Sequence, residues 1–343
     1  MRILFIGGTG VISSACSQLA IERGIDLYLL NRGESPRPVP AGARVIRADI
    51  RDAAATRNAL AGKTFDAVVD WIAYTPDQAQ NDINLFRDRT AQYVFISSAS
   101  VYQTPPASLP VTESTPLDNP YWLYSRNKIA CENLLTHAYR ETKFPATIVR
   151  PSHTYDRTKP PVPGGYTTID RMRKQQQVIV HGDGTSLWTL THHVDFAKAF
   201  IGLLGNNHAI GDAFHITSDE ILTWNQIFEI FAHTIGVEPR IVHVPSDYIA
   251  AFDPEFGAGL IGDKAHSMIF DNSKVKRVVP GFVATIPFAQ GAREIIDWFN
   301  ADPARQISDS RFNQLFDRII AAFESSLPKT LPENKTLGSS PSV

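Results

Sequence analysis

The first half of the chain alternates short apolar runs with longer amphipathic stretches. Six runs predict strands: RILFIG (2–7), DLYLL (26–30), RVIRA (44–48), DAVVDWI (66–72), YVFIS (93–97) and ATIVRP (146–151). Helical patterns lie between them, near 11–23, 53–61, 77–88 and 121–142. Several runs are apolar at consecutive positions, which is typical of strands covered on both faces. The repeated strand–helix–strand order predicts an α/β fold with a doubly wound parallel sheet.

The rhythm changes after Pro151. Prolines and glycines crowd residues 160–165, and a short strand candidate, VIVHG, follows at 178–182. A helical pattern then covers 223–236. This mixture predicts a second region of different architecture.

We divide the chain accordingly. Residues 1–153 predict one domain, and 154–324 predict mainly a smaller, mixed substrate domain over the carboxyl edge of the sheet. Segments near 178–200 are expected to return partly to the sheet. Residues 325–343 lack hydrophobic periodicity and predict a disordered tail.

Composition and charge narrow the classes of function. The 343 residues are 43% hydrophobic and carry a formal net charge of −2, as in an ordinary globular protein. Because a nucleic-acid-binding protein would show a clear basic excess, we expect no nucleic-acid partner. No stretch approaches the roughly 18 apolar residues of a membrane span, so we expect no membrane partner and a cytoplasmic location. The two cysteines, Cys16 and Cys131, suit a reducing compartment.

A glycine-rich loop follows the first predicted strand. In GGTGVIS, Gly7 and Gly10 are three residues apart, and a helical pattern begins near Val11. Glycines let the backbone approach a pyrophosphate, and the start of a helix offers free N–H groups. A glycine cluster can also be only a turn. Its place between a buried strand and a helix favours dinucleotide binding, with Gly7, Gly10, Val11 and Ile12 as contacts.

The end of the second predicted strand bears on the choice between NAD and NADP. An acidic residue there would bond the ribose 2′-hydroxyl, but this chain has Asn31 and Arg32. An arginine can pair with a 2′-phosphate, although an exposed loop arginine is the plainer alternative. The sequence therefore favours NADP over NAD.

A tyrosine is followed four residues later by a lysine three times: Tyr124 with Lys128, Tyr139 with Lys143, and Tyr155 with Lys159. Ligands of a doubly wound sheet bind beyond the carboxyl ends of its strands, where Tyr124 would begin its helix. Tyr139 lies about 22 Å further along the same helix, at about 1.5 Å per residue. Two prolines after Lys159 argue against a helix there. Tyr124 and Lys128 are therefore the candidate catalytic pair.

Serines follow the fifth predicted strand. Ser97, Ser98 and Ser100 lie in ISSASVY, at the edge of the sheet where Tyr124 is expected. A hydroxyl there can hold a substrate oxygen beside the tyrosine. Loop serines are common, but this placement favours Ser98 as a catalytic residue.

Together these segments resemble the extended short-chain dehydrogenase/reductase family, best known for nucleotide-sugar epimerases and dehydratases. The resemblance rests on GGTGVI, ADIRD (48–52), SSASVY (97–102), the Tyr124–Lys128 pair, VRPSHTY (149–155) and DNSKVKRVVPGF…GARE (271–294). It implies a Rossmann-type cofactor domain. It also implies that Asp49 and Ile50 border the adenine, that Pro151 and His153 border the nicotinamide, and that Ser98 occupies the catalytic serine position. A homodimer, paired through the helices after the fourth and fifth strands, is a further implication.

The expected chemistry is proton transfer coupled to hydride transfer. A tyrosine with a pKa near 10 is a poor base at neutral pH. A lysine ammonium about 4–5 Å away would lower that pKa by roughly two units or more. Tyr124 would then take the proton of a secondary alcohol, Ser98 would orient the oxygen, and Lys128 would also hold the cofactor ribose.

Two departures from the family pattern limit the reaction and the substrate. Where 4,6-dehydratases carry an aspartate and a glutamate, this chain has Ala99 and Ser100, so dehydration of that type is not expected. Where nucleotide-binding members place an arginine, this chain has Trp188, which cannot neutralise a phosphate. We take Ser100, Tyr102 and Trp188 as candidate substrate contacts.

The adjacent His192 and His193 could suggest a metal. Neighbouring residues on a strand point to opposite faces, and no carboxylate motif surrounds the pair, so we expect structural histidines and no metal. Asp195 is expected to be structural as well.

Three functions compete. The leading one is an NAD(P)-dependent epimerase that oxidises a carbohydrate-like small molecule transiently and returns the same hydride. The second is a one-way NADPH-dependent ketone or aldehyde reductase, which the Arg32 interpretation favours. The third is a non-catalytic relative that binds nucleotide or RNA, against which the intact serine, tyrosine and lysine argue.

Overall fold

The centre of the molecule is a seven-stranded sheet whose neighbouring strands are all parallel. The computed structural model describes residues 1–328. In spatial order the strands are β11 (Ala213–Ile216), β6 (Ala146–Pro151), β5 (Tyr93–Ile96), β4 (Ala67–Asp70), β1 (Arg2–Ile6), β2 (Asp26–Asn31) and β3 (Arg44–Arg47). All six strands predicted for the first half lie in this sheet. The prediction of a Rossmann-type, doubly wound α/β fold is therefore confirmed.

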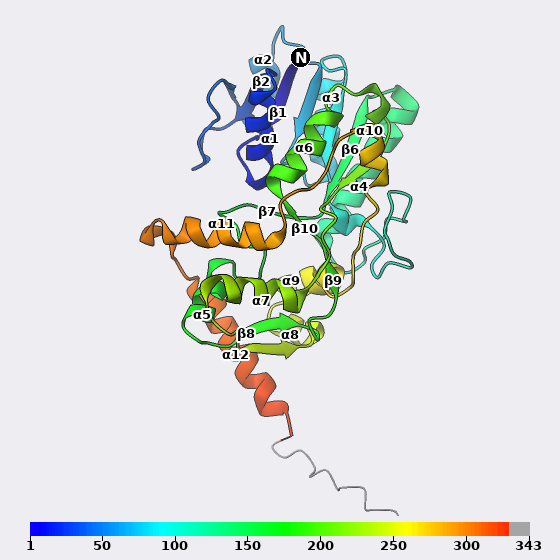
Figure 1. Ribbon diagram of the computed structural model, residues 1–343. Coiled ribbons are helices and arrows are strands. Elements are labelled where there is room, and N and C mark those ends of the chain that lie inside the picture. Colours follow the sequence, from blue (N-terminus) through cyan, green and yellow to red (C-terminus); the bar gives the residue numbers. More distant parts are fainter. Residues whose placement is uncertain (329–343) are drawn as a thin grey trace, which may run out of the picture.

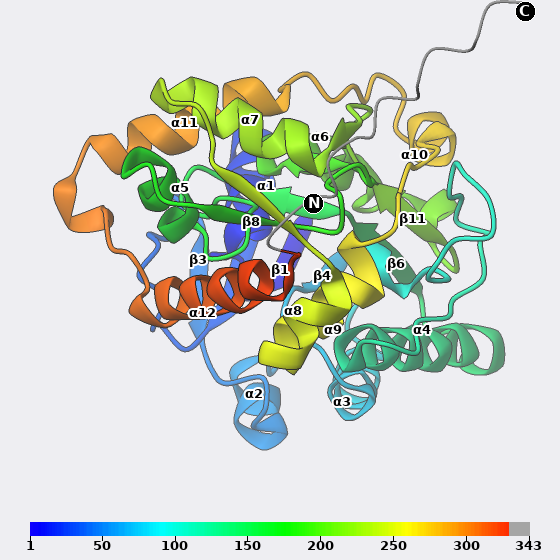
Figure 2. The ribbon, with the colours of Figure 1, turned by 90° about the horizontal axis from the view of Figure 1, so that it is seen from below.

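Helices cover both faces of the sheet (Figure 2). One face packs against α1 (Val11–Glu22), α6 (His193–Leu203) and α10 (Ser273–Val278), and the other against α2 (Ala53–Ala59), α3 (Pro76–Phe86) and α4 (Leu123–Thr142). Side chains of β1 enter the cores on both faces of the sheet. Ile3 and Phe5 belong to the core under α1 and α6, while Leu4 and Ile6 belong to the core under α3 and α4. This two-sided burial is why residues 3–6 are all apolar.

The remaining elements gather beyond one end of the sheet (Figure 1). The helices are α5 (Tyr166–Arg173), α7 (Trp224–Ile235), α8 (Ser246–Phe252), α9 (Pro254–Gly259), the π-helical turn η3 (Leu260–Lys264), α11 (Phe288–Asn300) and α12 (Ser310–Ser326). Three two-stranded sheets pair β7 (His153–Tyr155) with β10 (Leu190–His192), β9 (Leu187–Trp188) with β12 (Leu222–Thr223), and β8 (Val178–His181) with β13 (Ile241–Val244). The short 3₁₀ turn η4 (Pro303–Arg305) also belongs here, whereas η1 (Ala99–Val101) follows β5, and η2 (Asn207–Ala209) lies between α6 and β11 with Ala209 in the core under α1 and α6. The elements beyond the sheet bury cores of their own.

The two halves of the chain interleave. From the second half, α6 packs against α1, and β11 extends the central sheet beside β6. Within 178–200, β8 pairs with β13 outside the central sheet, while α6 begins at His193 and covers one face of that sheet. That segments near 178–200 return partly to the sheet stays a prediction. The division into domains at residue 153 stays a prediction.

The predicted tail starts too early. Positions 325 and 326 belong to α12, because this helix buries an apolar face that includes Phe316 and Ile320 against the β8–β13 pair and α8. Residues 329–343 lie outside the described part of the chain.

Amphipathic helices of the second region bury their apolar faces in its cores. For example, α7 buries Trp224, Phe228 and Phe231 in the core of the second region. Within residues 1–328, no helix combines the length and the apolar character that crossing a bilayer requires. Cys16 and Cys131 are buried and not in a disulfide.

Candidate active site

The glycine loop forms a cradle at the carboxyl end of β1. Gly7 and Gly8 have φ values of 97° and 96°, and the Gly7 N–H donates to the Leu30 carbonyl over 2.9 Å. A Cβ on Gly8 would lie 2.6 Å from the Leu29 side chain, so glycine is needed there. Helix α1 begins directly after the loop, at Val11. These contacts let the loop backbone come close to a pyrophosphate and leave the N–H groups at the start of α1 free to bind it.

Two further residues complete this cradle, and sequence reasoning did not use either. Gly8 is the first, although the doubled glycine of GGTG signals it. Ser13 is the second: it is buried, and its Oγ accepts a hydrogen bond of 2.7 Å from the Gly10 N–H. Ser13 therefore holds the loop to the first turn of α1.

A cavity of about 330 Å³ lies beside the loop, between the ends of β2 and β3. Gly7, Asn31, Arg32, Asp49 and Ile50 all line it, so the structure brings these five candidate cofactor contacts together. The residues fit the adenosine end of a dinucleotide, because a strand-end cavity adjoins a glycine cradle.

The charges at this end weaken the preference for NADP. The Arg32 guanidinium lies 3.0 Å from the Glu34 carboxylate and 3.9 Å from that of Asp49. Both carboxylates are lining groups of the same cavity. A 2′-phosphate would have to compete with these two carboxylates for Arg32. The sequence pattern did not reveal this competition.

Ser98 and Tyr124 line a second cavity, of about 290 Å³, at the same edge of the sheet. Ser98 follows β5 and begins η1, and Tyr124 lies in the first turn of α4. The Ser98 Oγ lies 2.9 Å from the Ser100 Oγ, which accepts a hydrogen bond of 2.8 Å from Ser125. This chain of hydroxyls fixes the position of Ser98 next to the tyrosine.

Lys128 lies beneath Tyr124 and is 2% exposed. Its ammonium donates hydrogen bonds of 2.7 Å to the carbonyls of Ala73 and Ile96, and it lies 5.8 Å from the centre of the Tyr124 ring. Burial lowers the pKa of Lys128 to about 8, and the charge of Asp70 opposes that shift. The three catalytic candidates are thus close together, but Lys128 is held by the backbone.

The expected acidity of Tyr124 is not found. Burial raises the pKa of the Tyr124 phenol, with a further contribution from Tyr74, while a hydrogen bond with Ser98 opposes the rise. A nearby lysine ammonium would lower this pKa, but the cost of burying a phenolate outweighs it. The Tyr124 phenol therefore keeps its proton at neutral pH.

The rest of this cavity comes from distant segments. Pro151 and His153 line it, as does Trp188, whose indole N–H donates to the His153 Nδ1 over 3.3 Å. Burial lowers the pKa of His153, so the ring is neutral and can accept that bond. Asp263 and Lys264 of η3 also line the cavity and form an ion pair of 2.9 Å, which no sequence pattern indicated.

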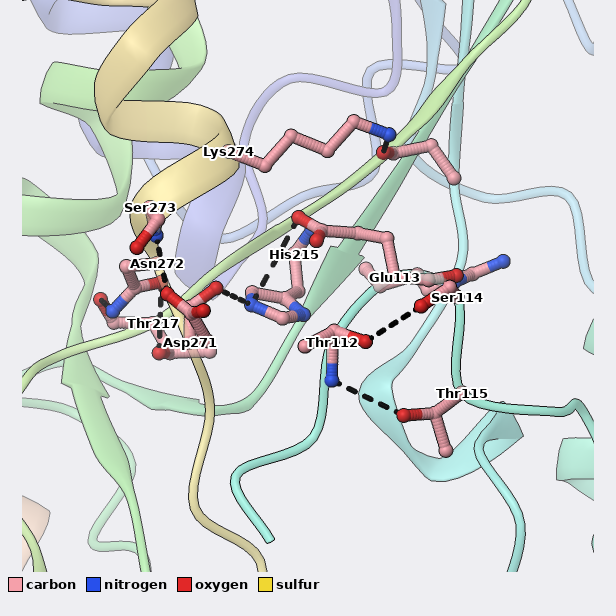
Figure 3. Close-up of polar contacts among 12 residues, drawn as sticks. Thr112, Glu113, Ser114, Thr115, His215, Thr217, Asp271, Asn272, Ser273 and Lys274 are labelled. Carbon is pink, nitrogen blue, oxygen red and sulfur yellow. Dashed lines mark hydrogen bonds and ion pairs between the residues drawn. The ribbon is translucent and has the colours of Figure 1, made fainter. Parts of the chain in front are cut away.

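Tyr102 is not a substrate contact. It is completely buried, and its hydroxyl lies 3.0 Å from the His215 Nδ1. The His215 Nε2 must donate to the Asp271 carbonyl, 2.7 Å away, so its Nδ1 accepts and Tyr102 donates. Figure 3 shows His215 between Glu113 and Asp271, in a polar cluster beside β11. The pattern SVY placed Tyr102 near the site but did not reveal this inward partner.

The other two tyrosine–lysine pairs are not sites. Helix α4 ends at Thr142, and Tyr139 packs over Gly211 at the far end of that helix. Tyr155 lies on β7 rather than in a helix and is 1% exposed, between His192 and Phe288, so it does not line the cavity.

The side chains of His192 and His193 do not point to opposite faces, as was expected for neighbours on a strand. The His192 and His193 rings meet edge to face with 4.8 Å between their centroids, because His192 caps α6 and His193 is its first residue. Each has a protein partner: Glu294 at 3.1 Å for His192, and the Val11 carbonyl at 3.1 Å for His193. Within residues 1–328, no three His, Cys, Asp or Glu side chains are grouped as metal ligands. Asp195 accepts hydrogen bonds from the Thr285 and Ile286 amides, which is a structural role.

Comparisons with known proteins show which family and which structures the chain resembles. A model of the NAD dependent epimerase/dehydratase family matches residues 3–217. The chain is 25% identical over 288 residues to the 2′-dehydrokanamycin reductase of Streptomyces kanamyceticus, covering 82% of this chain and 80% of that protein. It is 26% identical over 267 residues to a putative UDP-glucose 4-epimerase of Methanocaldococcus jannaschii, covering 70% and 85%.

Another relative and a solved structure extend the comparison. Chloroplast stem-loop binding protein of 41 kDa b, from Arabidopsis thaliana, is 25% identical over 261 residues, covering 71% of this chain and 65% of that protein. A structure of UDP-glucuronic acid 4-epimerase from Bacillus cereus, in complex with UDP-glucuronic acid and NAD, has a TM-score of 0.71 and 18% identity. That likeness covers 88% of this chain and 99% of the other, and it concerns the fold.

Proposed function

Because the chain belongs to the NAD dependent epimerase/dehydratase family, we propose that it is an NAD(P)-dependent epimerase of a sugar or nucleotide sugar. The observation that carries the proposal is the meeting of Ser98 and Tyr124 on the wall of one cavity, with Lys128 buried beneath. The glycine cradle lies at the same edge of the sheet. A bound nicotinamide dinucleotide would supply the acceptor and donor of hydride.

Each residue has a role that follows from its surroundings. Tyr124 moves the proton of a secondary hydroxyl, and Ser98 orients the oxygen that carries it. The Lys128 ammonium, fixed by two carbonyls, provides a positive charge under the phenol. Asn31, Asp49 and Ile50 would contact the adenosine, and Pro151 and His153 the nicotinamide.

The substrate side favours a two-part ligand. A groove of about 430 Å³ adjoins the catalytic cavity and shares Trp122, His153, Lys159 and Lys264 with it. One part of the substrate would react at Tyr124 while the other lies in this groove. Aromatic and proline side chains dominate its walls, which suits a ring with an apolar face.

A net ketone reductase is the second candidate, and one observation favours it specifically. Burial raises the pKa of Tyr124, so the phenol holds its proton at neutral pH, as the reduction of a ketone requires. A relative named as a reductase is consistent with this direction. Because Arg32 is paired with Glu34, the choice between NAD and NADP is a matter for a binding measurement.

A non-catalytic, RNA-binding role is a weaker alternative. A relative named as a stem-loop binding protein raises it. The net charge of −2 offers little attraction for phosphates, and the serine, tyrosine and lysine are all present.

One experiment separates the candidates. The purified protein is denatured, the released nucleotide is identified, and intact protein is then supplied with UDP-glucose, UDP-galactose and NADPH in turn. Retained NAD and interconversion of the sugars without net NADPH loss would support the epimerase. An empty protein that consumes NADPH with a carbonyl substrate would support the reductase, and binding of neither nucleotide would refute both.

A further inference from the structure

A buried carboxylate lies at the end of β4, on the strand next to the one that leads to Ser98. Asp70 is 2% exposed, and its Oδ1 accepts hydrogen bonds from the amides of Ile72 (2.6 Å) and Ala73 (2.8 Å). These bonds fold residues 70–73 into a tight turn. The turn presents the Ala73 carbonyl to the Lys128 ammonium at 2.7 Å. Asp70 therefore builds half of the seat that holds the lysine.

A second buried carboxyl group touches the first. Asp82 of α3 is 1% exposed, shares a hydrogen bond with Asp70, and accepts another of 2.6 Å from the Tyr93 hydroxyl. Two carboxyl groups in such contact cannot both be ionised. Burial and the neighbouring Asp70 raise the pKa of Asp82 well above its ordinary value. Because the pKa of Asp82 is the one that is raised, the shared proton belongs on Asp82.

The other groups around Lys128 do not supply a free negative charge. Glu132 is on the same helix, but Arg150 pairs with it through contacts of 2.6 and 3.0 Å. Burial raises the pKa of the Cys131 thiol to about 11, so it is neutral. Tyr74 and Tyr124 face the lysine through their rings, at 4.6 and 5.8 Å, and burial raises the pKa of both phenols.

We propose that Asp70 is a positioning residue for Lys128. Its carboxylate holds the turn that binds the ammonium and supplies the counter-charge that keeps the lysine protonated. Protonated Asp82 donates a hydrogen bond to Asp70 and is itself fixed by Tyr93. The relevance to catalysis rests on the proposed function, because only there does the charge of Lys128 matter for Tyr124.

The test follows the titration of Lys128 itself, without substrate or nucleotide. Protein labelled with ¹³C-lysine is titrated, and the ¹³Cε signal of Lys128 is assigned by its loss in Lys128→Met. Wild type should show an inflection near pH 8, the value to which burial lowers the pKa of this lysine. Asp70→Asn should shift the inflection down by about one pH unit or more, because a buried negative charge that raises the pKa of Lys128 is removed.

Asp82→Asn is the matched control. Its amide can donate to Asp70 and its oxygen can accept from Tyr93, so it reproduces the protonated acid. The inflection should stay within about 0.3 pH unit of wild type, since no charge changes. A shift as large as that of Asp70→Asn would mean that Asp82 carries the charge, and an unshifted Asp70→Asn would refute the proposal.

A measurement on the unmodified protein guards against misfolding of the variants. In ¹³C-aspartate-labelled wild type, one buried carboxyl should remain protonated at pH 7, and it should disappear in Asp82→Asn. If Asp70 and Asp82 were both ionised at pH 7, the proposal that Asp82 carries a proton would be refuted. If Asp70→Asn lowered the Lys128 inflection as expected but Tyr124→Phe remained active, the proposed function would be refuted. The positioning role of Asp70 would still be supported.

Discussion

The cofactor side and the substrate side of the candidate site are built in different ways. On the cofactor side, Gly7 directly follows β1, Asn31 is the last residue of β2, and Ser98 lies two residues after β5. Parallel neighbours in register bring such residues to one edge, so short sequence distance becomes short spatial distance. On the substrate side, Trp188 and Lys264 come from segments whose partners lie far away in the chain. Residues on the cofactor side can therefore be predicted from local sequence patterns, whereas residues on the substrate side cannot.

The two sides also differ in how they treat charge. The adenosine end keeps Arg32 and Glu34 about half exposed or more and paired with each other, which makes their attraction weak and sensitive to salt. Around the substrate cavity, burial lowers the pKa of His153 and His181, and those rings are neutral. A substitution should therefore act mildly at the first place and strongly in the second. The predictions below test this difference.

The largest effect is expected at the junction of the two sides. Tyr124→Phe should reduce turnover by about 10²-fold or more, because the proton donor is lost, while NADH affinity stays nearly unchanged. Tyr139→Phe is the matched control, since that tyrosine lies at the other end of α4. Steady-state rates and NADH fluorescence titration measure both properties. Near-normal turnover of Tyr124→Phe would contradict the assignment.

The next effect concerns the cradle. Gly8→Ala should destabilise the fold by about 2–4 kcal/mol, because the new Cβ meets the buried Leu29 side chain and the residue has a positive φ. Gly62→Ala has the same kind of φ but open space around it, so about 1 kcal/mol is expected. Urea unfolding compares the two. Equal losses would show that backbone strain alone matters at Gly8.

Acidification should affect the substrate side. Burial lowers the pKa of His181 from 6.5 to about 4. Between these values the unfolded chain binds the proton and the folded chain does not, so stability falls as the pH drops from about 6.5 to 4. The loss from this residue is at most about 3 kcal/mol and is complete below pH 4. Thermal unfolding across this range should show a shallower pH dependence in His181→Gln, and an unchanged one in the exposed control His137→Gln.

The smallest effect is expected at the adenosine end. Glu34→Gln releases Arg32 from its 3.0 Å ion pair. The affinity for NADPH relative to NADH should then rise by roughly 3- to 10-fold at low salt and by less at high salt. Fluorescence titrations with the two nucleotides measure the ratio. An unchanged ratio would mean that Arg32 does not face the 2′ position.

Local pattern was enough for much of the site. The run 2–7, the loop after it and the start of α4 place the glycines, Ser98, Tyr124 and Lys128 at one edge, because alternation of strands and helices fixes which end of each element faces the ligand. The same reasoning failed for Tyr102, which shares a motif with Ser98 but turns inward to His215. Direction of a side chain in a loop depends on partners that the local sequence does not contain.

What the sequence by itself determined is the parallel sheet, the glycine cradle and the candidate catalytic trio of Ser98, Tyr124 and Lys128, since these follow from periodicity and from positions next to strand ends. Only the tertiary structure decided the protonation of that trio and the walls of the substrate cavity. Burial shifts the pKa of Tyr124 and of Lys128, and Asp70 reaches the lysine through the Ala73 carbonyl in the loop after β4. Desolvation and long-range contacts depend on how distant segments pack, which no local pattern records.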